Sequence, residues 1–185
     1  MEFTLNNEEK KEILMVSRKT LNSYISDGVI PKFNFDNEKY KLKCGGFVTL
    51  NKDGNLRGCI GYIEPFKPLL ETIIEMTINA STKDPRFSPV SSEELEKIKI
   101  DISILSPLEK IEDIDKIIVG KHGILIRKGR YSGVLLPQVA TEWGWERKTF
   151  IEQTCNKAGL PIDSYKEGAD IYIFSAQIFG EDKDN

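Results

Sequence analysis

The chain has 185 residues and a mass of 21.0 kDa, and 39% of its residues are hydrophobic while 30% are charged. That length suffices to bury a full core, so we expect a single domain over residues 1–185, built as one body or as two intimate lobes. With a formal net charge of -3, the chain lacks the overall basic character of a nucleic-acid-binding protein. No apolar run approaches the roughly 20 residues that span a bilayer.

Helix caps, prolines and hydrophobic periodicity predict a mixture of helices and strands. An asparagine cap followed by acidic residues favours a first helix that ends at Gly28. Isoleucines at every second position from Ile98 to Ile104 are typical of a strand covered on one face, which favours an antiparallel sheet. The predicted order is a helix over 7–28, a hairpin over 44–63, a helix from Pro68, a charged loop over 84–89, a strand over 98–104, a hairpin over 123–136, a short helix from Pro137, a helix over 147–158, a strand over 170–179 and a disordered tail over 181–185.

The turn near Gly54 sets the predicted register of the first hairpin. A three-residue loop closed by a left-handed Gly54 and a bulge pairs Phe47 with Cys59 across the two strands. A two-residue Asp53-Gly54 turn shifts the register by one and mixes the faces, so the bulged loop is favoured. In that register Cys59 lies on the face opposite an apolar one. The apolar face consists of Cys44, Val48, Leu50, Leu56, Ile60 and Tyr62.

The segment Leu56–Gly61 is the most informative part of the chain. Residues two apart on a strand share a face about 6.7 Å apart along the chain, so Arg57 is predicted to place a cation beside the Cys59 thiol. A neighbouring cation favours a thiolate nucleophile, whereas most free cysteines are small, buried and inert. Arg57 itself suits recognition of a carboxylate or phosphate or an ion pair, and the alternative is a solvated strand residue.

This segment resembles the signature of the AMMECR domain family, named after the Alport syndrome, midface hypoplasia and elliptocytosis chromosomal region. Further segments match the family in the same order, so the similarity covers nearly the whole chain. They are Asp84–Phe87, His122–Gly123, Leu135–Ala140 and Lys157–Pro161. The resemblance implies an α+β fold, with an antiparallel sheet flanked by helices and a second, smaller lobe beside it. It names no reaction, but many microbes encode the family alongside a Memo-like protein and a radical S-adenosylmethionine protein, which implies a shared modification pathway.

Four other residues complete the set of candidates. His122 is the only histidine, so a catalytic Cys-His pair must use it, although a lone loop histidine is more commonly hydrogen-bonded for structure. Asp84 and Arg86 either orient a substrate or form a structural ion pair. Glu142 is either a base or substrate-binding group or an ordinary exposed helix carboxylate. We expect the signature strand, the loop that follows the second helix and His122 to converge on one cleft between the lobes.

Two functions remain open. In the first, the chain is an enzyme or a component of a modification pathway, and Cys59 and His122 act on a small anionic or carbonyl substrate in an inter-lobe cleft. In the second, it is a non-catalytic binding or adaptor module for a small anionic ligand or a protein partner. The substrate-binding candidates in either case are Arg57, Asp84, Arg86 and Glu142.

Motifs that are missing from the sequence and the pattern of cysteines bear on possible cofactors and on the cellular compartment. The chain carries no Walker loop, no dinucleotide-binding fingerprint and no HExxH motif, so no cofactor is assigned. Three dispersed cysteines and one histidine do not predict a metal site. Because the cysteines form no CxxC pair and the N-terminus lacks a signal-peptide pattern, the expected compartment is the reducing cytoplasm.

Overall fold

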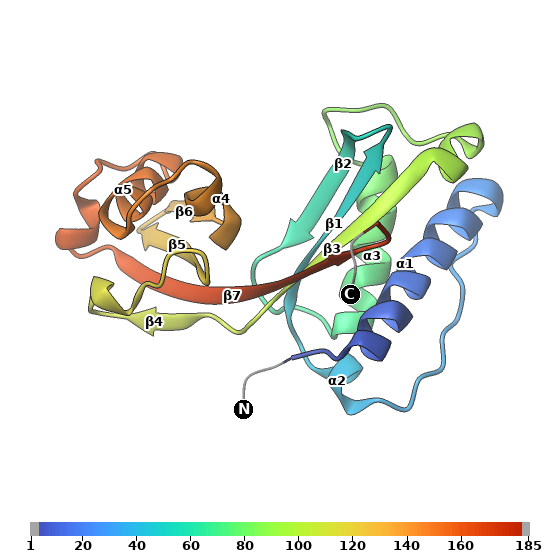
Figure 1. Ribbon diagram of the computed structural model, residues 1–185, viewed down its shortest axis with the longest axis horizontal. Coiled ribbons are helices and arrows are strands. Elements are labelled where there is room, and N and C mark those ends of the chain that lie inside the picture. Colours follow the sequence, from blue (N-terminus) through green and yellow to red (C-terminus); the bar gives the residue numbers. More distant parts are fainter. Residues whose placement is uncertain (1–3, 183–185) are drawn as a thin grey trace. The chain divides into compact units, whose positions relative to one another are not determined.

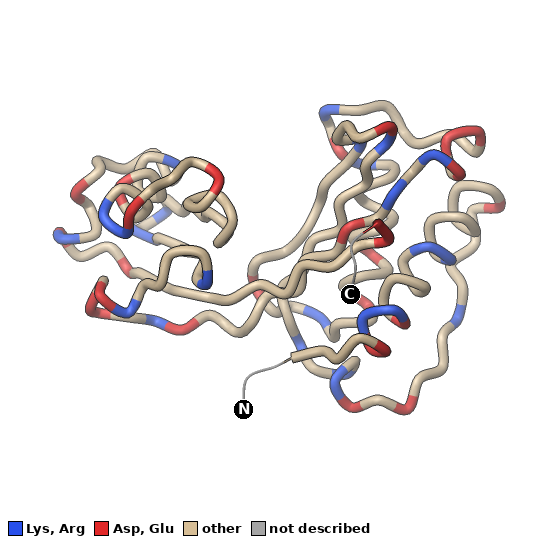
Figure 2. Tube along the Cα trace, in the orientation of Figure 1, with Lys and Arg blue, Asp and Glu red and all other residues tan. Residues whose placement is uncertain are grey.

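The computed structural model describes residues 4–182, which form two compact units. Unit 1 comprises the chain up to Leu105 together with the stretch from Gln177 onward, and unit 2 is Ser106–Ala176. Antiparallel strands flanked by helices build both units, so the predicted α+β fold class is confirmed. Figure 2 shows acidic and basic residues interspersed along both units. None of the helices in the described part of the chain has the length and apolar character that crossing a bilayer requires.

Two helices and a sheet enclose the core of unit 1 (Figure 1). Helix α3 packs on β1 and β2, and α1 packs on α3 and β3, while the last residues of β7 lie beside β3. The core buries side chains of alternating strand positions such as Val48 and Ile102, as expected for strands with one covered face. The elements of unit 1 are α1 (Asn7–Asp27), α2 (Glu38–Lys41), β1 (Gly45–Lys52), β2 (Asn55–Tyr62), α3 (Leu69–Thr82), a 3-10 helix (Ser92–Lys97), β3 (Ile98–Leu105) and the end of β7 (Asp170–Gly180).

The first helix begins and ends where the sequence predicted. The Asn6 side chain accepts a hydrogen bond from the Glu9 backbone at 2.9 Å, and the Glu9 carboxylate accepts one from the Asn6 backbone at 2.8 Å. This reciprocal arrangement satisfies amide groups that have no partner within the helix. Gly28 ends the helix in the left-handed conformation, with φ of 68°.

The turn of the first hairpin differs from the predicted one. Asp53 and Gly54 both have positive φ, 51° and 78°, and they form a two-residue turn that pairs Lys52 with Asn55. Positive φ at both central positions matches the right-handed twist of the flanking strands. An aspartate tolerates this conformation better than most residues other than glycine. The preference for a longer loop was therefore wrong.

A bulge corrects the register that this short turn sets. The pairing shifts between Leu50 and the next residue of β1, which leaves Arg57 as the extra residue on β2. Cys59 consequently pairs with Thr49 and not with Phe47. The predicted faces hold beyond the bulge but fail before it, because Leu56 on the turn side is 41% exposed. The sequence-based argument did not consider a short turn combined with a bulge.

Unit 2 is built on a sheet in the order β4-β7-β5-β6, with α5 packed against β6. The predicted hairpin, the short helix that begins at Pro137 and the helix that follows it are all confirmed. The short strand β4 was not predicted. The elements of unit 2 are β4 (Glu109–Ile111), two 3-10 helices (Ile114–Lys116 and Ser164–Lys166), β5 (His122–Lys128), β6 (Tyr131–Leu135), α4 (Pro137–Glu142), α5 (Arg147–Lys157) and the first part of β7.

The predicted disordered tail begins too early. Glu181 pairs with the guanidinium of Arg18 at 2.5 Å, and its carboxylate accepts a hydrogen bond from the Ile100 backbone at 3.0 Å. The Glu181 backbone also donates to the Ile100 carbonyl, so the chain continues alongside β3 past the end of β7. Residues 183–185 of the predicted tail lie outside the described residues.

Gly58 in the signature segment gives a test of close backbone packing. A Cβ at this position would lie 2.1 Å from the carbonyl oxygen of Ala80 on α3, so the helix and strand approach too closely for any side chain. We expect Gly58→Ala to lower the free energy of unfolding by about 3 kcal/mol, the upper range for overpacking. Urea denaturation measures this loss.

Gly46→Ala on the adjacent strand is the matched control. Its Cβ would meet atoms no closer than 3.4 Å, so a loss below about 1 kcal/mol is expected. Equal losses for the two variants would contradict the close approach of α3 to β2.

Candidate functional site

Cys59 lies on β2, the edge strand of the sheet in unit 1. An edge strand presents backbone groups that have no neighbouring strand to bond. Here the Cys59 amide donates to Oδ2 of Asp84 at 2.8 Å, and the Cys59 carbonyl accepts from Nη2 of Arg86 at 3.3 Å. These two side chains therefore bond the outer edge of the strand at the cysteine, as a neighbouring strand would.

The Asp84 carboxylate is the most buried charged group of this arrangement, since only 2% of its side chain is exposed. It accepts two hydrogen bonds from the Arg86 guanidinium, at 2.9 and 2.6 Å, and one from the Arg86 backbone at 3.1 Å. Hydrogen bonds from Arg86 hold the pKa of Asp84 far below its usual range, against the effect of burial. Asp84 is thus an ionised acceptor with every bond directed at Cys59 or Arg86.

Arg86 is the exposed partner of this pair. Its side chain is 53% exposed, and its guanidinium carbon lies 5.5 Å from the centre of the Phe87 ring. Nε and Nη2 donate to the Asp84 carboxylate, and Nη2 also donates to the Cys59 carbonyl. Nη1 bonds no other group in residues 4–182. A positive group with a spare donor therefore lies next to the Cys59 peptide, where it can receive an anionic oxygen.

The Arg57 guanidinium is engaged in an ion pair. Its guanidinium forms two hydrogen bonds with Glu94, both at 2.9 Å, and donates to the backbone carbonyls of Ser88 and Pro89. Only 13% of its side chain is exposed. Arg57 was predicted to recognise an anion or to form an ion pair, with a solvated strand residue as the alternative. The structure shows an ion pair, and Arg57 attaches the loop after α3 to β2.

Glu94 is a residue that the sequence analysis missed. Its carboxylate bonds Arg57 and also Lys52 at 2.8 Å, and hydrogen bonds from Arg57 and then Lys52 lower its pKa well below the usual range. It also accepts from the Ser91 backbone at 3.0 Å. The spacing Ser91-x-x-Glu94 is a capping-box pattern that was available in the sequence, although it indicates a helix start and not an arginine partner.

The thiol of Cys59 differs from the other two cysteines. The Thr49 hydroxyl donates a hydrogen bond to its Sγ at 3.2 Å, and the residue is half-buried. Burial raises the pKa of Cys44 to about 12 and also raises the pKa of Cys155. All three cysteines are free. Thr49 was not among the predicted site residues, because its position depends on the unpredicted register.

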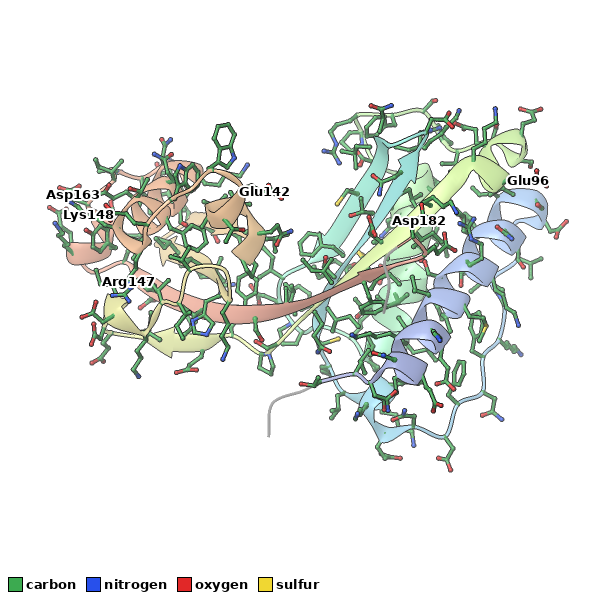
Figure 3. All side chains as sticks on the ribbon, viewed as in Figure 1. Glu96, Glu142, Arg147, Lys148, Asp163 and Asp182 are labelled. Carbon is green, nitrogen blue, oxygen red and sulfur yellow. The ribbon has the colours of Figure 1, made fainter. Side chains whose placement is uncertain are left out.

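His122 and Glu142 belong to unit 2. His122 begins β5, and its Nδ1 lies 3.1 Å from the Lys116 carbonyl and 3.2 Å from the Ile118 amide. Two opposite tautomers fit these contacts: an unprotonated Nδ1 accepts from the Ile118 amide, or a protonated Nδ1 donates to the Lys116 carbonyl and leaves Nε2 unprotonated. Glu142 is exposed at the end of α4, where Figure 3 labels it. Their proposed roles in the chemistry of Cys59 stay predictions.

The described residues contain no group of three or more histidine, cysteine, aspartate or glutamate side chains that could hold a metal ion. Asp84 and Glu94 are instead bound to arginine side chains. The site around Cys59 is thus a thiol with a hydroxyl beside it and an exposed guanidinium next to its peptide.

Comparison with known proteins identifies the family. The AMMECR1 family model matches residues 14–179. The chain belongs to the AMMECR1 family. It is 43% identical to a protein from Methanothermobacter thermautotrophicus, with 96% of this chain and 97% of that protein covered. It is 42% identical to protein MJ0810 from Methanocaldococcus jannaschii, with 96% and 92% covered.

A solved structure of an AMMECR1 relative supports the same fold. The crystal structure of the uncharacterized protein PH0010 from Pyrococcus horikoshii matches with a TM-score of 0.85 and 38% identity. The match covers 96% of this chain and 94% of that one. The printed names of these relatives state no activity, so the chemistry of this AMMECR1 protein must be argued from its own side chains.

The low pKa of Asp84 predicts how stability depends on pH. A carboxyl whose pKa is lower in the folded than in the unfolded chain stabilises the fold above the unfolded-state pKa, roughly 4, and this contribution is lost as the pH falls toward the folded-state pKa. We therefore expect the free energy of unfolding to decrease between about pH 5 and about pH 2. Asp84→Asn should reduce that decrease by at least about 1 kcal/mol.

Urea denaturation over this pH range measures the effect, with the exposed Asp36→Asn as the control. The control should keep the wild-type pH dependence. An Asp84→Asn variant with an unchanged pH dependence would show that Asp84 does not carry this stabilisation.

Proposed function

We propose that this AMMECR1 protein is an enzyme in which Cys59 is the nucleophile and the substrate is a small molecule with a carbonyl group and a negative charge. The observation that carries the proposal is the fixation of Cys59 on both sides of its peptide by Asp84 and Arg86. A cysteine that only fills space does not need its backbone held in this way. A reacting group needs a fixed position, because small displacements from the productive geometry slow the reaction.

The side chains around the sulfur fit a carbonyl addition. Sγ forms a bond to the carbonyl carbon, the π electrons of the C=O bond move to its oxygen, and the thiol proton passes to a base. The Thr49 hydroxyl donates to Sγ, and a hydrogen bond to a negatively charged atom favours that charge. The spare Nη1 donor of Arg86 would bind the negative group of the substrate.

His122 is the proposed base. It is the only histidine of the chain, and Asp84 and Glu94 are both committed to arginine partners. The proposal requires the tautomer that donates from Nδ1 to the Lys116 carbonyl, because in that tautomer Nε2 can accept a proton. The modification pathway with Memo-like and radical S-adenosylmethionine proteins, implied by the family resemblance, is part of the same proposal.

A binding module remains the second candidate, because unit 1 contains no histidine of its own. In this case Arg86 binds an anionic ligand, and Cys59 is present for its size. The two functions differ in the reactivity of the sulfur, which can be measured without knowing the substrate.

Alkylation tests Cys59 as a nucleophile. With iodoacetamide at neutral pH, we expect Cys59 to react before Cys44 and Cys155, and faster than glutathione under the same conditions. Arg86→Gln should slow the reaction several-fold, because it removes the cation nearest the Cys59 peptide. Mass mapping of the folded protein measures the rates.

Lys83→Gln, at an exposed position just before the loop, makes the same charge change and should leave the rate unchanged. A Cys59 no faster than glutathione, or one indifferent to Arg86→Gln, would favour the binding module.

His122→Asn tests the base separately. Asparagine keeps a polar atom close to the place of Nδ1 but has nothing at Nε2, so local bonding to Lys116 can persist while the proton acceptor is lost. We expect slower alkylation of Cys59 at neutral pH with an unchanged unfolding midpoint. A rate equal to that of the wild type would remove His122 from the mechanism.

A further inference from the structure

The chain's two tryptophans form a stack in unit 2, next to Glu142 in the sequence. Trp143 follows α4, and its ring lies 6.0 Å from that of Trp145 between centroids, with 19° between the planes. Trp143 is 70% exposed. Large aromatic side chains are usually well buried on average, so an indole left in water is a feature that needs a reason.

The turn that carries this stack is well ordered by backbone hydrogen bonds. The Trp143 amide bonds the Val139 carbonyl at 3.1 Å, and the Trp145 amide bonds the Ala140 carbonyl at 2.8 Å. Gly144 between the two indoles has φ of 64°, which turns the chain sharply. Trp145 packs against the core of unit 2. Trp143 is therefore presented on a fixed support, with Trp145 behind one face of its ring.

Negative charge flanks the exposed indole in the sequence. Glu142 and Glu146 are both exposed, and neither forms an ion pair within the described part of the chain. The nearest basic residues are occupied elsewhere, because Arg147 bonds Asp115 and the Ile117 carbonyl, and Lys148 lies near Glu152. Figure 3 shows Arg147 and Glu142 well apart from each other.

A cation is the chemical group that this arrangement fits. The face of an indole attracts positive charge, and carboxylates beside it add to that attraction. Of the two basic side chains, arginine fits better, because its planar guanidinium stacks on the ring while its edges donate to carboxylates. Exposed aromatic residues with arginine opposite them are common centres of protein interfaces.

We propose that Glu142, Trp143 and Glu146 form a docking site for an arginine side chain of a protein partner. The site goes beyond the proposed chemistry at Cys59 and does not depend on it. It uses only the last residue of α4 and residues of the connection that leads to α5, and it gives Glu142 a role without any catalytic step.

The chain itself contains the reporter for the test. Because Trp143 and Trp145 are its only tryptophans, intrinsic tryptophan fluorescence reports on this site alone. We expect titration with a blocked tetra-arginine peptide to change the fluorescence and to reach saturation. Trp143→Ala should weaken the apparent affinity at least about fivefold, with Trp145 as the remaining reporter. Its unfolding midpoint should not change, because the removed side chain is 70% exposed.

Paired charge variants separate a site from general attraction. The double variant Glu142→Gln and Glu146→Gln should weaken binding of the tetra-arginine peptide several-fold. Glu109→Gln with Glu112→Gln makes the same charge change at exposed positions of unit 2 and should leave binding unchanged. A tetra-lysine peptide should bind more weakly than the tetra-arginine peptide.

Three results would overturn the proposal. They are equal effects of the two double variants, binding of the lysine peptide as tight as that of the arginine peptide, and sedimentation showing a wild-type dimer that Trp143→Ala converts to a monomer. The last result would mean that the indole packs against a second copy of this chain.

Discussion

The buried carboxylate of Asp84 is the interaction on which the candidate site depends. A carboxylate with 2% of its side chain exposed is costly to desolvate unless charged and backbone donors surround it. Its donors are the guanidinium and backbone of Arg86 and the backbone of Cys59, so the same bonds that stabilise the buried charge also fix the cysteine. Stability and site geometry cannot be separated here, because removing Asp84 frees an edge-strand amide and releases Arg86 at once.

A second ion pair fixes the other end of the loop after α3. Arg57 bonds Glu94 and the carbonyls of Ser88 and Pro89, so the loop is attached to β2 at Arg57 as well as at Cys59. Arg57 is the extra residue of the bulge in β2. Arg57 and Arg86 both form ion pairs with carboxylates, and the two side chains differ in exposure. Arg57, the nearer of the two to Cys59 in sequence, is mostly buried in its ion pair with Glu94. Arg86, from a separate loop, supplies the exposed positive charge.

Local signals in the sequence predicted the elements well but not the contacts among them. The cap at Asn6, the stop at Gly28 and the helix start at Pro137 depend on neighbouring residues only, and all were confirmed. The pairing of Cys59 with Thr49 depends on a turn and a bulge acting together, and choosing between registers from faces alone gave the wrong partner. Glu94 was missed for a related reason. Its partner Arg57 lies 37 positions away in the sequence, and no local sequence pattern around either residue predicts that the two side chains meet.

The distribution of titratable groups between the two units bears on what kind of enzyme this AMMECR1 protein can be. Unit 1 supplies a thiol, a hydroxyl donor and a guanidinium, but its carboxylates at the site have their pKa lowered by arginine partners and are poor proton acceptors at neutral pH. The only histidine belongs to unit 2. Neither carboxylate is therefore a good candidate for the base of an acid-base step at Cys59. A ligand-binding role requires no base, because Arg86 needs no proton transfer to hold an anion. A catalytic role thus requires a proton acceptor for the Cys59 thiol, whereas a binding role does not.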